Sequence, residues 1–423
     1  MNRTTATLVA LLVPVALLTL VGLAALWPEG EPPRTGIVAL EAEYPHGRVV
    51  SAVEESCAGT NEDRRQDGTI PESVPCTVAT VEVTSGPDEG ERVEVWAPAT
   101  VRAPALPTGT EVVLTKYVGT DGEPDVFAWY DFARSAPLGV LAAAFAVVVV
   151  AVAGMRGLRA LVGLGVAFAV IGAFVLPALL EGRDPLTVGL VGSTAIMFVV
   201  LYLAHGFSLR TTTALLGTLA GLGVTAVLGL VAARATHLTG ISTEEGYRLA
   251  MLTGQLEGTA LRGVFLCGVV LAGLGVLNDV TITQASSVWE LRAADPHASR
   301  GDLFRRGMRI GRDHIASTVY TIAFAYTGAA LPVLLLLQVY RIPLGQTFAS
   351  GEFAEEVART LVGSIGLVLA IPLTTAIAAL VVTTAAVARE GAGHGHAGAH
   401  VADGDRDAAV LRDPAAGEPH PTP

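Results

Sequence analysis

Residues 264–332 carry polar side chains at helical spacing inside otherwise apolar sequence. Asp279 is the only carboxylate inside an apolar run of the chain, and Asn278 precedes it. A carboxylate at the centre of a bilayer costs at least about 2.5–3.5 kcal/mol, so a residue of this kind tends to mark an ion or proton route. On a helix, four polar residues would share one side at spacings of three or four: Asp279, Thr283, Ser286 and Glu290.

A second apolar stretch carries a matching set of polar residues. Asp313, Ser317 and Tyr320 would share one side of a helix, with Thr321 at the edge of that side. We expect this polar face to meet the face around Asp279 across a helical hairpin, so that together they line a path.

A plainer interpretation stays open for each of these residues. Asp279 could lie near the inner interface, with the helix ending by Thr283 and residues 284–312 forming a surface helix. Asp313, beside Arg312, could serve as a cap or a partner of the helix dipole. The hydroxyl groups could be ordinary hydrogen-bond partners between helices, worth about 0.6 kcal/mol each.

The elements that would position these residues are membrane helices. The chain is 51% hydrophobic and only 16% charged, with a mean hydropathy of +0.54, whereas soluble domains carry about 25% charged residues. Runs of about 20 apolar residues are long enough to cross a bilayer. Eight such runs predict eight spans: 7–27, 136–154, 158–180, 185–204, 209–232, 261–283, 315–338 and 359–387.

The arginines predict the orientation of the spans. Six of them cluster in one loop, at positions 292, 300, 305, 306, 309 and 312. Because loops rich in Lys and Arg stay on the cytoplasmic side, we expect the N-terminus and the C-terminal tail inside. The first run resembles a signal peptide in its charge-then-apolar order, but its length favours an uncleaved helix. The predicted location is a bacterial inner membrane.

Residues 28–136 have the character of a soluble domain. They hold 20 acidic and 8 basic residues, which accounts for the whole formal net charge of −12 and argues against a nucleic-acid partner. Short alternating runs such as 77–83 and 92–96, separated by Gly, Pro and Asp, predict five or six strands in a small barrel or sandwich. Outside the cytoplasm, Cys57 and Cys76 are expected to form a disulfide.

The expected organisation is therefore a membrane helix (1–27), an outer β domain (28–136), a seven-helix membrane domain (137–388) and a disordered tail (389–423). The tail is rich in His, but nothing in it fixes a metal geometry. No nucleotide-binding loop, HExxH pattern or GxSxG elbow occurs. The sequence thus predicts neither a cofactor, nor a metal site, nor enzymatic activity.

Several motifs resemble the YibE/F-like family of bacterial membrane proteins. They are Gly273-Leu274-Gly275 with Asp279, Ala285-Ser286-Ser287 with Glu290, Gly311-Arg312-Asp313, and Ala325-Tyr326-Thr327-Gly328 running to Leu331-Pro332. The outer domain resembles that family's domain as well, through 84–87 and 130–134. The resemblance implies a polytopic membrane protein and, by common supposition, a permease. A shorter similarity of 277–279 to the SecD/SecF export subunits favours proton coupling.

Two functions fit these observations. The first is a permease or secondary transporter for a small solute or ion, with Asp279 as the protonation or ion site. The second is a membrane scaffold that does not transport, whose outer domain binds an envelope protein. In either case the lipid bilayer is a partner.

Overall fold

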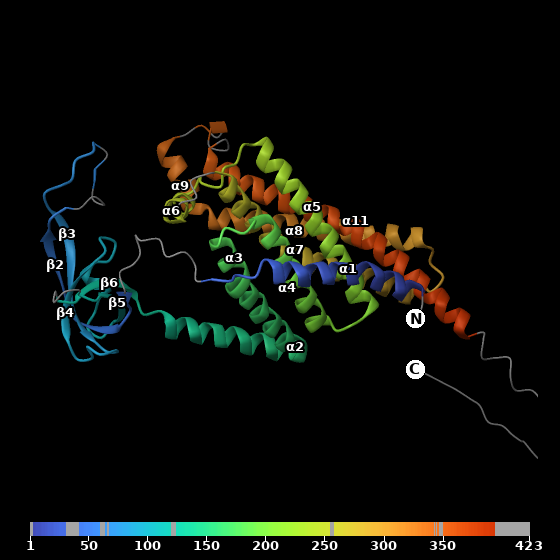
Figure 1. Cartoon of the computed structure of the whole chain (residues 1–423), viewed down its shortest axis with the longest axis horizontal. Helices are drawn as coiled ribbons and strands as arrows, with labels where there is room; N and C mark the ends of the chain where they lie inside the picture. Colours follow the sequence, from blue (N-terminus) through green and yellow to red (C-terminus); the bar gives the residue numbers. More distant parts are fainter. Residues whose placement is uncertain are drawn as a thin grey trace, which may run out of the picture.

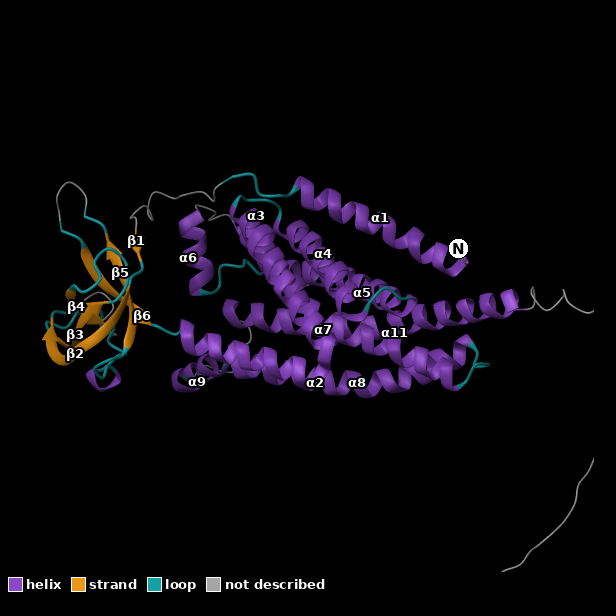
Figure 2. Cartoon of the chain, turned by 90° about the horizontal axis from the view of Figure 1, so that it is seen from below, coloured by secondary structure: helices purple, strands orange, loops and turns teal. Residues whose placement is uncertain are grey.

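The computed structural model describes residues 3–30, 42–59, 64–65, 67–119, 124–253, 258–341, 343, 345–346 and 350–393. It has two parts, a small β domain at one end and a long bundle of helices (Figure 2). In the sequence, the β domain lies between the first and the second helix of the bundle.

The β domain is an antiparallel half-barrel. Its strands pair in the order β1-β5-β2-β3-β4, and β6 pairs with the other side of β5. This agrees with the prediction of five or six strands. The strands are β1 (Ala42–Glu43), β2 (His46–Cys57), β3 (Val74–Val83), β4 (Arg92–Ala97), β5 (Glu111–Tyr117) and β6 (Val126–Phe132).

The alternation seen in the sequence decides which face of each strand is buried. Along β3 and β4 every second residue points into the core, including Val81 and Val95. The β3–β4 turn uses Gly86 and Gly90 at positive φ, where glycine carries no steric penalty. Period-two patterning with turn punctuation therefore predicted this domain well.

Two covalent or ionic links brace the half-barrel. A disulfide joins Cys57 at the end of β2 to Cys76 on β3, the pair expected from the sequence. Lys116 is buried and forms ion pairs with Asp88 and, at 2.8 Å, with Asp125. This contact raises the pKa of Lys116 above its usual value and lowers that of Asp125.

Apart from loops and one 3-10 turn in the β domain (Ala103–Ala105), the rest of the described chain is helical. The helices are α1 (Arg3–Ala25), α2 (Ser135–Val170), a π-helical stretch (Ile171–Val175), α3 (Leu176–Leu180), α4 (Pro185–His205), α5 (Leu209–Ala235), α6 (Glu244–Thr253), α7 (Gly258–Ala294), α8 (Arg300–Ala329), α9 (Leu331–Tyr340) and α11 (Gly351–Gly393). Six helical segments of the described residues are long and apolar enough to cross a membrane, or seven if the bent pair α8–α9 forms one span.

One of those six segments changes direction. The segment Ser135–Leu180 has 46 residues, which corresponds to about 69 Å of continuous helix. Gly154 interrupts it with non-helical angles, φ 60° and ψ −141°. Figure 1 shows that α2 leads away from the β domain and that the chain then turns back towards α3. The structure thus separates the predicted runs 136–154 and 158–180 by a glycine turn.

The ends of the helices lie at two opposite ends of the bundle. Figure 1 places the start of α1, the α7–α8 connection and the end of α11 at one end of the bundle, and the β domain, α6 and α9 at the other. The arginine cluster therefore lies at the same end as the N-terminus.

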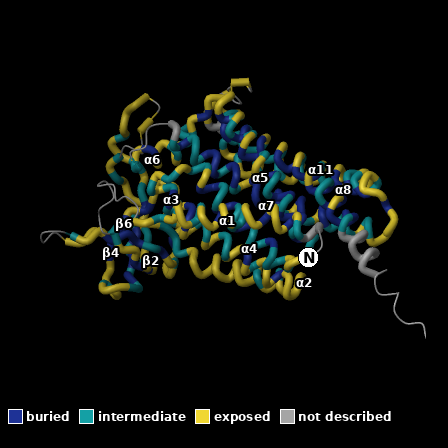
Figure 3. The backbone as a smooth tube through the Cα atoms, turned by 45° about the vertical axis from the view of Figure 1, so that its right-hand side comes forward, coloured by how far each residue is buried: buried dark blue, intermediate teal, exposed yellow. Residues whose placement is uncertain are grey.

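Helices α5, α7 and α11 form the centre of the bundle, seen as the dark segments in Figure 3. Small residues let them approach closely. A Cβ added at Gly221 would lie 2.8 Å from Leu277 and 3.0 Å from Ala370. Buried threonines fill the same layer, and the hydroxyls of Thr218 and Thr281 are 2.6 Å apart.

Several helix boundaries differ from the expectations. The predicted run 315–338 is not one helix, because α8 begins at Arg300 and the chain bends by 67° between α8 and α9. Helix α7 does not end by Thr283 but continues to Ala294, so residues 284–312 are not a separate surface helix. Helix α11 continues to Gly393, five residues into the segment 389–423 that was expected to be disordered. The remainder of that segment, from 394, lies outside the described residues.

Candidate functional site

The exposed face of α7 carries the polar residues that the sequence singled out. Asp279, Thr283 and Glu290 are exposed and Ser286 is half-buried. They lie opposite the face that packs on α5 and α11, which includes Leu277, Thr281, Gln284 and Val288. The predicted polar side is therefore present on one continuous helix. We refer to it, with the residues that continue it at spacings of three or four, as the α7 stripe.

The structure brings the side chain of His314 on α8 close to Asp279. Its Nε2 lies 4.0 Å from Asp279 Oδ2, and the Asp279 side chain is 71% exposed. Both His314 Nε2 and Asn278 Oδ1 are buried and lack a hydrogen-bond partner among the described residues. Since buried polar atoms are normally paired, the His314 nitrogen beside Asp279 has spare capacity to bind a water or an ion. His314 was not among the residues predicted from the sequence.

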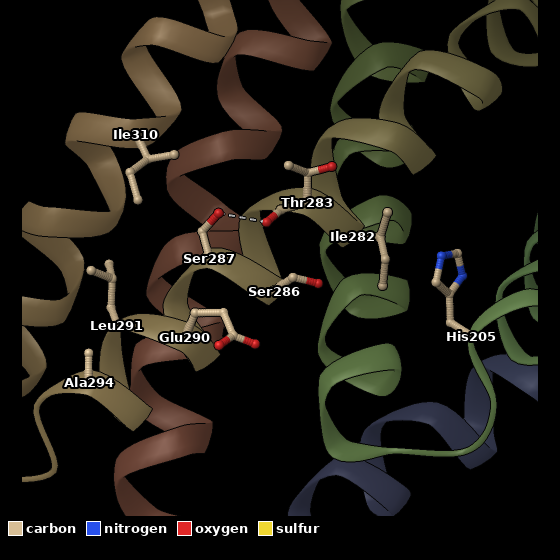
Figure 4. A pocket seen from close by; sticks show the side chains of 9 residues that line it. All are labelled: His205, Ile282, Thr283, Ser286, Ser287, Glu290, Leu291, Ala294 and Ile310. Atoms are coloured by element: carbon tan, nitrogen blue, oxygen red, sulfur yellow. Dashed lines mark hydrogen bonds between the residues drawn. The ribbon is translucent and has the colours of Figure 1, made fainter. Parts of the chain in front are cut away.

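An open groove of about 640 Å³ lies one turn from Asp279 towards the α7–α8 connection. Thr283, Ser286 and Glu290 line it, together with Ser287, whose hydroxyl donates to the Thr283 carbonyl at 2.9 Å. His205, the last residue of α4, faces them across the groove (Figure 4). Three of the predicted residues thus share one polar groove with a histidine that the sequence analysis did not select.

A small cavity of about 30 Å³ lies on the other side of Asp279, between α7, α8 and α11. Arg359, Tyr326 and Ser364 line it. The Arg359 guanidinium lies over the Phe265 ring at 5.4 Å, and its Nε is 3.4 Å from Glu356.

The same stripe of α7 lines both the groove and the cavity. Val269, Ala272 and Val276 line the cavity, and the stripe continues at spacings of three or four through Asp279 to the groove residues. The Asp279–His314 pair therefore lies between a polar groove and a cavity that contains Arg359.

Close helix packing does not involve Gly275 of α7, because a Cβ there would meet nothing within 4 Å. Close contact occurs at Gly307 and Gly311 of α8 instead, where a Cβ would lie 2.9 Å from Thr375 and 2.6 Å from Ile371.

The polar residues predicted on α8 do not face α7. Asp313, Ser317 and Thr321 are exposed and Tyr320 is 64% exposed. The side of α8 that packs on α7 and α11 carries Gly311, Ile315 and Ile322 instead. The two polar faces therefore do not meet across the hairpin in this structure, and a transport role for the α8 residues stays a prediction.

Buried polar residues on the opposite face of α7 were missed altogether. Gln284 is 2% exposed, and its Nε2 donates to Gly307 O at 2.8 Å and to Thr375 Oγ1 at 2.7 Å. It thereby links α7 to α8 and α11. The sequence held a signal for this contact, because glycines four residues apart at 307 and 311 favour close packing of helices.

The fold and site define a polytopic helical protein with an appended β half-barrel and a polar face on one long central helix. The model of the family described as YibE/F-like protein matches residues 141–384, more than half of the chain. The chain therefore belongs to the YibE/F-like family, as its motifs suggested. The match begins after the β domain, so the likeness of that domain to the family's outer domain stays a prediction. No curated protein and no solved structure matches the chain.

Proposed function

We propose that this protein is a permease for a small solute or ion, coupled to protons through Asp279. The observation that supports it is the position of the Asp279–His314 pair, between the groove and the Arg359 cavity. Asp279 binds and releases the proton, and the groove gives water access from one side. The proposal involves no catalytic chemistry.

The depth of Asp279 supports an intramembrane role. Helix α4 has 21 residues, a length of about 32 Å that matches the hydrocarbon core of about 30 Å. Its first residue, Pro185, packs against Gly263 of α7, where a Cβ would lie 2.9 Å from Pro185 Cγ. Its last residue, His205, reaches the groove. Asp279 is 16 residues beyond Gly263, or about 24 Å along α7, and thus lies between the two ends of α4.

The sizes of the two openings support proton coupling. The groove of about 640 Å³ is large enough to hold several waters or a small solute. The cavity of about 30 Å³ has room for about one water molecule. A proton can pass such a cavity through water and hydroxyl groups, whereas a larger solute requires the helices to move.

We further propose eight spans in a bacterial inner membrane. Counting both halves of Ser135–Leu180 and the bent pair α8–α9, whose axes differ by 67°, gives eight crossings. The shared end of the N-terminus and the arginine cluster in Figure 1 supports a cytoplasmic assignment for both. The β domain would then lie outside the cytoplasm.

A flux assay in proteoliposomes tests the proton step. With an imposed pH gradient, Asp279→Asn should reduce proton flux by at least about tenfold, because the amide cannot titrate. Asp295→Asn is the matched control, since Asp295 lies in the α7–α8 connection and pairs with Arg306 at 3.1 Å. This control should keep the wild-type flux.

Unchanged flux in Asp279→Asn would overturn the proposed mechanism. The scaffold function would gain support if deletion of 35–130 removed a growth phenotype while flux persisted. In that case the outer domain, by binding an envelope protein, would be the functional part.

A further inference from the structure

The β domain has a hollow of its own, separate from the groove and the cavity among the helices. Its volume is about 700 Å³, within the range of sites for small molecules. Trp96 and Trp129 line it, with Glu55, Pro98 and the disulfide between Cys57 and Cys76. We refer to it as the tryptophan groove.

The groove follows the open seam of the half-barrel. Trp96 comes from β4 and Trp129 from β6, two strands that lie side by side but form no ladder with each other among the described residues. Trp96 is 69% exposed. Trp129 is half-buried and held edge-on to Phe132, with ring centroids 5.4 Å apart. One ring is therefore free to contact a ligand and the other is fixed.

Glu55 supplies a carboxylate on the same face of the sheet as Trp96. The registers place Glu55 opposite Cys76 and Val78 opposite Trp96. From the usual strand spacing, the Cα atoms of Glu55 and Trp96 are about 12 Å apart. At that separation, the side chains of Glu55 and Trp96 can contact a compact ligand from opposite sides. Glu55 forms no ion pair with the described residues.

The charges of the domain favour a cation in this groove. Its segment carries 20 acidic and 8 basic residues. Several bases are already neutralised: Arg92 pairs with Glu82, Arg102 with Glu54, and Arg134 with Asp131. Lys116 is held by two aspartates.

The exposed tryptophan is not explained by contact with the bilayer. Figures 1 and 2 place β2, β3 and β4 on the side of the domain that faces away from the helices, whereas β6 leads into α2. A membrane-anchoring tryptophan would be expected on the helix side.

We propose that the tryptophan groove binds a small organic ammonium ion, with the Trp96 ring face and the Glu55 carboxylate both against its cationic group. An aromatic face and a carboxylate together favour a cation of this kind over a neutral or anionic molecule. The inference does not depend on transport through the helices.

Choline and its neutral isostere 3,3-dimethylbutan-1-ol are the probes, and the full chain in lipid nanodiscs is the sample. Binding is followed by calorimetry. Choline should bind saturably, and the isostere at least about tenfold more weakly, because only choline has cation–π and ionic attraction. Equal affinity for the two probes, or no saturable choline binding, would overturn the proposal.

Two variants locate the site. Trp96→Ala and Glu55→Gln should each weaken choline binding by about five- to thirtyfold. Glu111→Gln removes the same charge from an exposed position outside the groove and should leave binding unchanged. Thermal unfolding of each variant checks that the domain is folded. A loss of affinity in Glu111→Gln equal to that in Glu55→Gln would show only a general charge effect and contradict the assigned groove.

Discussion

The two faces of α7 carry similar residue types in different surroundings. On the buried face, Thr281 and Gln284 have partners on α5, α8 and α11. On the exposed face, the Asp279 carboxylate lies 4.0 Å from a histidine nitrogen that has no hydrogen-bond partner among the described residues. Polarity within an apolar helix is therefore not enough to indicate function. A satisfied polar group holds helices together, and an unsatisfied one is available for a ligand or a proton.

The largest effect on stability is expected from the glutamine that links three helices. Gln284→Leu removes both hydrogen bonds of Nε2 and leaves Gly307 O and Thr375 Oγ1 without this donor. We expect a loss of about 2–3 kcal/mol in the free energy of unfolding. Thermal unfolding in detergent measures it. The matched control is Thr283→Val on the exposed face, and an equal loss there would erase the distinction between the faces.

A smaller loss is expected from a methyl group added between α8 and α11. Gly311→Ala would place its Cβ 2.6 Å from Ile371 Cγ2, so the Ile371 side chain or one of the two helices must shift. Overpacking of this kind costs about 1–3 kcal/mol, and we expect about 1–2 kcal/mol here because the contact is with a side-chain methyl group. Gly275→Ala, whose Cβ would meet nothing within 4 Å, is the control. Equal melting temperatures for the two variants would mean that α8 packs less closely than described.

The smallest effect is expected at the threonine pair between α5 and α7. Thr281→Val removes the 2.6 Å contact with Thr218. Thr218 keeps its hydrogen bond to the Ala214 carbonyl at 3.0 Å, so no polar group is left unpaired. The expected loss is about 0.6 kcal/mol. A double-mutant cycle with Thr218→Val isolates the pair, and a coupling well above about 2 kcal/mol would refute this interpretation.

Local patterns predicted much of the architecture. Alternation predicted the strands of the β domain, and apolar run lengths predicted most of the helices, including the two halves on either side of Gly154. They predicted neither α6 nor the bend between α8 and α9. These features depend on residues close together in the chain. The stripe around Asp279 was predictable for the same reason, because helical periodicity is local.

The partners of these faces were not predictable from the sequence. Both faces of α7 carry small and polar residues, so periodicity alone cannot decide which one packs on α5 and α11. That choice depends on glycines of other helices, such as Gly221 and Gly311, which accept side chains at close range. The same limit explains α8, where Asp313 and Ser317 matched the expected pattern but His314, next in sequence to Asp313, reaches Asp279.

Cysteine accessibility tests the contrast between the two faces most directly. In a Cys267→Ala background, with the Cys57–Cys76 disulfide intact, single cysteines are introduced as Ser286→Cys and Thr283→Cys on the groove face and Thr281→Cys and Gln284→Cys on the buried face. A membrane-impermeant thiol reagent is applied to inside-out vesicles, which on the proposed topology expose the side of the arginine cluster. We predict rapid labelling at 283 and 286 and protection at 281 and 284. Equal labelling of both faces, or protection of 283 and 286, would contradict it.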